Sequence, residues 1–62
     1  QRPVTIVVDG KLVGEINIPA TRDKRRIAHA ALKLPHVRER IGNRTLRDVR
    51  LEGQDTAHLI AG

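Results

Sequence analysis

Apolar residues alternate along the first third of the chain in the way that is typical of strands. In residues 4–8, three apolar side chains share one face of an extended segment: Val4, Ile6 and Val8. In residues 11–18, the same spacing places four residues on one face: Leu12, Gly14, Ile16 and Ile18. The intervening Asp9-Gly10 favours the positive φ angles of a tight turn, and Pro19 ends the second strand. The pattern predicts a β-hairpin over residues 4–19 with one apolar face that another element must cover.

The spacing of apolar residues then changes to a helical period. One stripe at positions i, i+3, i+4 and i+7 contains Ile27, Ala30, Ala31 and Leu34. This stripe predicts a helix over about residues 23–33 that packs on the hairpin. Pro35 ends this helix, because the residue before a proline is pushed out of the α region. Pro35 also favours the start of a second short helix over 35–41, with Val37 and Ile41 facing inward.

The last third of the chain reads as two more strands. Gly42-Asn43 is a typical helix stop. A strand is predicted over 45–51 with Val49 and Leu51 inward, followed by a turn and a short strand over 57–61. We therefore expect a single α+β domain over residues 1–62. Its order is β-β-α-β-β, with helix packed on one face of a mostly antiparallel sheet.

Composition limits the kind of protein this is. The chain has 62 residues, with no cysteine and no aromatic residue, so it has no disulfide and its core must be aliphatic. No apolar run approaches the roughly 20 residues that a membrane span needs, so we expect no membrane partner. The chain begins at Gln1 rather than Met, and we therefore expect it to be a fragment, a processed product or a trimmed chain, whose function belongs to a larger parent protein.

No pattern typical of catalysis is present. The seven acidic residues are scattered, with no pair placed for acid–base chemistry. The three histidines lie on different predicted elements without the spacing of metal ligands: His29, His36 and His58. No glycine-rich loop for phosphates is present either. We expect no catalytic residue, no metal and no cofactor in this segment.

The charge of the chain is concentrated in its middle. Residues 22–50 hold ten basic and three acidic residues, a net charge of +7, whereas the remainder carries −2. Lys24, Arg25 and Arg26 crowd a predicted helix N-terminus, where the helix dipole disfavours each cation by about 0.3–1 kcal/mol. On a helical wheel, Arg25, Arg26 and Lys33, together with His29, point away from the Ile27 stripe. This arrangement favours contact with phosphates, and its alternative is a solvated helix face.

The absence of aromatic residues narrows the type of nucleic acid. Proteins that read single strands usually stack bases on Phe, Tyr or Trp, which this chain lacks. A basic surface without such rings suits the backbone of a folded, double-helical RNA that is recognised by shape.

Several runs of residues resemble a known family. They are Val-Thr-Ile-Val-Val-Asp-Gly-Lys-Leu at 4–12, Ile-Asn-Ile-Pro at 16–19 and Val-Arg-Glu-Arg-Ile-Gly-Asn-Arg-Thr-Leu-Arg-Asp-Val at 37–49. In this order they resemble the C-terminal domain of bacterial-type leucyl-tRNA synthetase. The resemblance implies a small α+β, tRNA-binding module on a flexible tether, packed on the outer corner of tRNA. It also implies a cytoplasmic parent enzyme that ligates leucine to tRNA with ATP, in domains other than this one.

The candidate RNA-binding residues form two groups. The resemblance selects Lys11, Arg44 and Arg47, and the charge pattern selects Lys24, Arg25, Arg26 and Lys33. The family usually carries Pro-Gly-Lys after its third strand, where this chain has Glu52-Gly53-Gln54 and so lacks that Lys. The family also often carries acids at the start of the helix, where this chain has Lys24, Arg25 and Arg26. Two alternatives stay open: a protein-interaction module of β-grasp type, and a generic basic nucleic-acid-binding domain of another parent.

Overall fold

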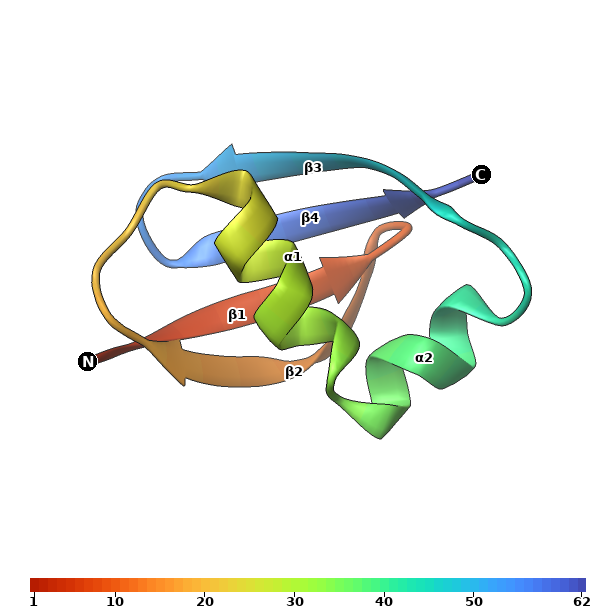
Figure 1. Cartoon of the computed structure of the whole chain (residues 1–62), viewed down its shortest axis with the longest axis horizontal. Coiled ribbons are helices and arrows are strands. Elements are labelled where there is room, and N and C mark those ends of the chain that lie inside the picture. Colours follow the sequence, from red (N-terminus) through yellow and green to blue (C-terminus); the bar gives the residue numbers. More distant parts are fainter.

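Four strands form one mixed sheet, and two helices cover one of its faces (Figure 1). The computed structural model describes all residues, 1–62. In chain order the elements are β1 (Arg2–Val8), β2 (Lys11–Ile18), α1 (Lys24–Leu32), α2 (Pro35–Ile41), β3 (Leu46–Glu52) and β4 (Thr56–Ala61). The sheet order is β2-β1-β4-β3. The predicted α+β class and the predicted elements are confirmed, and α2 has the predicted bounds.

The two outer strand pairs are antiparallel, whereas the central pair, β1 with β4, is parallel. The first and last strands therefore lie side by side in the middle of the sheet, and the two ends of the chain leave from opposite ends of it (Figure 1). The sheet is mostly antiparallel, as predicted from the sequence.

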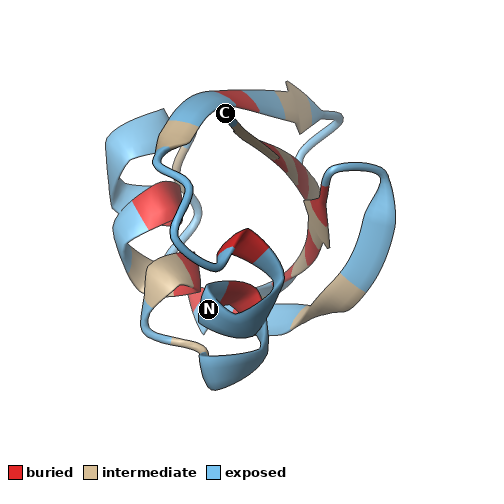
Figure 2. Ribbon diagram, turned by 90° about the vertical axis from the view of Figure 1, so that its right-hand side faces the viewer, coloured by how far each residue is buried: buried red, intermediate tan, exposed pale blue.

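The core lies between the helices and the sheet, and it is entirely aliphatic. Figure 2 shows the buried positions on the inward sides of both layers. The 13 buried residues are Val4, Ile6, Val8, Ile16, Ile18, Ile27, Ala28, Ala31, Val37, Ile41, Val49, Ala57 and Leu59. Because each buried aliphatic side chain contributes about 1.5–3 kcal/mol, this cluster is the main source of stability.

One predicted core position is wrong. Leu12 is 67% exposed, although the alternation of β2 placed it on the buried face. The ladder between β1 and β2 pairs Ile6 with Gly14 and then Val7 with Leu12, which leaves Val13 as an extra residue. This bulge moves Leu12 to the uncovered face of the sheet, while Val13 packs against the core.

Helix α1 begins at Lys24 because Asp23 caps it. The Asp23 carboxylate accepts a hydrogen bond from the backbone N–H of Arg25 at 3.0 Å. The stripe predicted for this helix is shifted slightly: Ala28 is buried with Ile27 and Ala31, whereas Ala30 and Leu34 are half-buried at its edge.

Candidate nucleic-acid interface

The turn between β1 and β2 contains Asp9, which pairs with the candidate residue Arg44. Asp9 has a φ of 49° and Gly10 a φ of 84°, as the tight turn requires. One Asp9 oxygen accepts the backbone N–H of Ala61 at 3.1 Å, and the other lies 2.7 Å from Nη1 of Arg44. The pKa of the Asp9 carboxyl is lowered below its usual value. The hydrogen bond from the Ala61 N–H is the larger cause, and the hydrogen bond from the Arg44 guanidinium is the next. Asp9 is therefore a carboxylate at neutral pH.

Arg44 uses its remaining nitrogens on the end of α2. Its Nε donates to the carbonyl oxygen of Ile41 at 3.1 Å, and its Nη2 donates to that of Arg40 at 2.8 Å. All three guanidinium nitrogens therefore have a partner within the chain. The side chain selected by the resemblance joins the hairpin turn to the C-terminus of α2, and much of its hydrogen-bonding capacity is already used.

Arg47 lies in a different place from Arg44. The β3–β4 ladder pairs Leu46 with Ala61 and then Asp48 with Ile60, so Arg47 has no partner in it. At this second bulge, β3 passes beside the start of α1. A shallow hollow between the two elements, here called the α1–β3 hollow, is lined by Lys24, Arg25, Ala28, Leu46, Arg47, Asp48 and Val49. The structure thus joins Arg47 to two members of the other candidate group.

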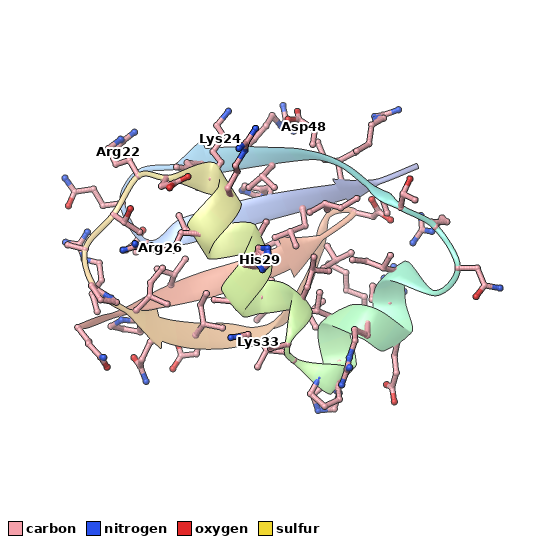
Figure 3. All side chains as sticks on the ribbon, viewed as in Figure 1. Arg22, Lys24, Arg26, His29, Lys33 and Asp48 are labelled. Atoms are coloured by element: carbon pink, nitrogen blue, oxygen red, sulfur yellow. The ribbon has the colours of Figure 1, made fainter.

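The remaining candidates lie elsewhere. Figure 3 shows Lys24 extending towards β3, whereas Arg26 and Lys33 extend from the opposite side of α1, with His29 near them. Lys11 lines a separate hollow at the start of β2, together with His36, Glu39 and Arg40. The seven predicted residues therefore occupy four sites: the α1–β3 hollow, the far side of α1, the start of β2 and the Arg44 contact.

Most of the basic side chains have no acidic partner in the structure. Of the 12 lysines and arginines, Arg44 alone lies within 4.0 Å of a carboxylate. The other two close pairs join histidines to glutamates, His36 with Glu39 and His58 with Glu52. The other six candidates are therefore exposed, unpaired cations: Lys11, Lys24, Arg25, Arg26, Lys33 and Arg47.

Two charged residues that lie near the candidates were not among the predicted RNA-binding residues. Arg40 lies beside Lys11, and Asp48 is a carboxylate in the α1–β3 hollow. The sequence shows both charges but not their neighbours, because each residue meets the candidates only through the packing of distant elements. No group of three His, Cys, Asp or Glu side chains is placed to hold a metal ion. None of the helices has the length and apolar character to cross a membrane.

Comparison with solved structures finds a match over almost the whole chain. The chain is similar to part of the leucyl-tRNA synthetase of Agrobacterium radiobacter, whose crystal structure is a ternary complex with tRNA and LeuAMS. The TM-score is 0.81 and the sequences are 28% identical, over 97% of this chain and 8% of that one. No family model and no curated protein matches the chain. The similarity confirms the resemblance predicted from the sequence: this chain has the fold of a leucyl-tRNA synthetase domain, consistent with a C-terminal one.

Proposed function

We propose that this chain is the tRNA-binding appendix domain of a leucyl-tRNA synthetase and contacts the outer corner of tRNA through its basic surface. The observation that carries this proposal is the set of unpaired cations around α1 and β3, of which Lys24, Arg25 and Arg47 line one hollow. The similarity to a synthetase that was solved with tRNA supports the same partner. In this proposal the parent enzyme is cytoplasmic, and leucine and ATP bind to domains outside this segment.

The physical basis is electrostatic. A phosphate that meets a Lys or Arg releases condensed counterions, so affinity falls as salt rises. With no aromatic residue, the chain contacts phosphates and riboses rather than stacked bases. The domain therefore binds folded tRNA with little preference for sequence.

A titration of labelled tRNA with the 62-residue chain at several salt concentrations tests the proposal. About three phosphate contacts give a slope of roughly −2 to −3 in log K against log salt. The control is an unstructured RNA of the same length as the tRNA. We expect weaker binding to it, because in this proposal the basic surface matches the shape of a folded RNA backbone. Absence of tRNA binding at low salt would contradict the proposal.

A protein-interaction module of β-grasp type is the second candidate. One observation favours it: Leu12 is exposed beside its strand partner Val7 on the sheet face that no helix covers. The strand order does not separate the candidates, because β2-β1-β4-β3 with a parallel central pair also suits a β-grasp sheet. The tRNA titration separates them, since an interaction module gives no salt-dependent binding to RNA.

A further inference from the structure

We propose that the α1–β3 hollow is the place where this domain holds a backbone phosphate of RNA, and that Asp48 weakens this contact. The inference rests on the proposed function and assigns one of the four basic sites to the ligand. Three cations from two elements converge on the hollow: Lys24 and Arg25 from the first turn of α1, and Arg47 from the β3 bulge.

The position of these three cations is electrostatically unfavourable when no anion is bound. Lys24 and Arg25 lie at the positive end of the helix dipole, and Arg47 adds a third like charge. The Asp23 carboxylate does not line the hollow, and it already accepts the Arg25 N–H as the helix cap. A bound anion would relieve both the mutual repulsion and the interaction with the dipole.

A count of charges separates this hollow from the one at Lys11. The α1–β3 hollow contains three cations and one carboxylate, Asp48. The hollow at Lys11 contains two cations, with Arg40, and one carboxylate, Glu39. The first site therefore has the larger excess of positive charge, +2 against +1 with histidine neutral.

The lining of the hollow fits a phosphodiester unit of the backbone. Two of its three cations are arginines, whose planar guanidinium groups bind phosphate oxygens in pairs. Its floor is apolar, made of Ala28, Leu46 and Val49, and can contact the carbon atoms of a ribose. No aromatic ring is present to hold a base.

Asp48 makes the inference testable by a gain of affinity. Its Oδ1 accepts the backbone N–H of Val49 at 2.8 Å, an acceptor that the side-chain oxygen of Asn retains. Asp48→Asn therefore removes the negative charge while keeping the local hydrogen bond. We expect tRNA binding to become about two- to fivefold tighter at low salt. An unfolded or loosened variant would not gain affinity in this way.

The matched control is Glu15→Gln. Glu15 is exposed on β2, at the far edge of the sheet from β3, and has no ion-pair partner. Glu15→Gln changes the net charge of the chain by the same amount as Asp48→Asn, but at a position outside the hollow. If the two substitutions tighten binding equally, the effect is one of net charge, and the assignment of the hollow is wrong.

Two double variants test the complementary effect, a loss of affinity for tRNA. Arg25→Gln/Arg47→Gln removes two charges from the hollow, and Arg26→Gln/Lys33→Gln removes two from the far side of α1. We expect the first to weaken tRNA binding about tenfold and to flatten the salt slope by about one unit. The second should change both quantities clearly less. Thermal unfolding by circular dichroism verifies that both variants fold, since all four side chains are exposed.

The outcomes distinguish this inference from the function on which it rests. The inference is supported if Asp48→Asn tightens binding more than Glu15→Gln does, and if Arg25→Gln/Arg47→Gln weakens it more than Arg26→Gln/Lys33→Gln does. Equal losses from both double variants overturn it, because the cations then act as one diffuse surface, while the RNA-binding function stands. If the unchanged chain binds no tRNA even at low salt, the proposed function fails as well.

Discussion

Arg44 and Asp9 are joined across the molecule: Nη1 of Arg44 lies 2.7 Å from the Asp9 carboxylate. The pair connects the hairpin turn to the loop that follows α2, in which Arg44 lies three positions after Ile41, and Asp9 in turn accepts the Ala61 N–H at the end of β4. Three parts of the chain therefore meet at one carboxylate. This contact makes Arg44 a structural residue first, whatever it contributes to binding.

We expect Arg44→Ala to lower Tm by several degrees, because it removes the ion pair and two hydrogen bonds to the α2 carbonyls. Arg38→Ala is the control: Arg38 is also exposed on the helix layer, but its side chain has no bonded partner. Both variants lose one positive charge, so thermal unfolding separates structure from charge. Equal Tm values for the two variants would contradict the structural role of Arg44.

Asp9 should make stability depend on pH in the acidic range. Its pKa is lowered in the folded chain by the Ala61 N–H and the Arg44 guanidinium. The folded state therefore favours the carboxylate, and this contribution is complete above the unfolded pKa of about 4. It is lost as pH falls through the folded pKa.

Asp9→Asn measures this contribution directly. The variant keeps an oxygen acceptor for Ala61, and Asn tolerates the positive φ, but it loses the charge. We expect the wild-type chain to be more stable than Asp9→Asn at pH 7, and this difference to shrink as the pH falls below the unfolded pKa of about 4. Thermal unfolding at a series of pH values tests it. A constant difference would show that the Asp9 charge is not involved.

The bulge in β2 predicts opposite outcomes for two apolar residues of the same strand. Leu12→Gln should change the free energy of unfolding by less than about 0.5 kcal/mol, because Leu12 faces solvent. Ile16→Ala should lower it by about 2–5 kcal/mol, because Ile16 is in the core. Chemical denaturation measures both. A large loss in Leu12→Gln would mean that β2 lacks the bulge in solution.

Substitutions on the inward and outward faces of α1 should differ in their effect on folding. Ile27 is 2% exposed, so Ile27→Asp buries an unpaired carboxylate and should unfold the domain, whose total stability is of the order of 5–15 kcal/mol. His29→Asp, on the exposed side of the same helix, is the control and should stay folded. Circular dichroism distinguishes them. A cooperative thermal transition in Ile27→Asp would show that the assigned face is wrong.

Local patterns were enough to predict most of the fold. Alternation identified Ile6 and Val8 as core residues, and Pro35 marked the boundary between the helices. The exposed Leu12 was missed, because a bulge depends on how two strands pair rather than on either strand alone.

The candidate site was less predictable for a related reason. The charges were visible in the sequence, but their grouping depends on where β3 lies relative to α1. Arg44 and Arg47 are three positions apart, yet one holds Asp9 and the other lines the α1–β3 hollow. Only the packed structure separates a residue that stabilises the fold from one that is free to bind.

The parallel pairing of β1 with β4 also has a mechanical consequence. Because the terminal strands are neighbours and leave the sheet at opposite ends, a pull on both ends of the chain acts along the strands. The hydrogen bonds in the paired stretch, from Thr5 with Thr56 to Val8 with Leu59, then carry the force together rather than one after another. We expect a domain joined to other parts through both ends to resist such shear better than an antiparallel terminal pair, which would unzip.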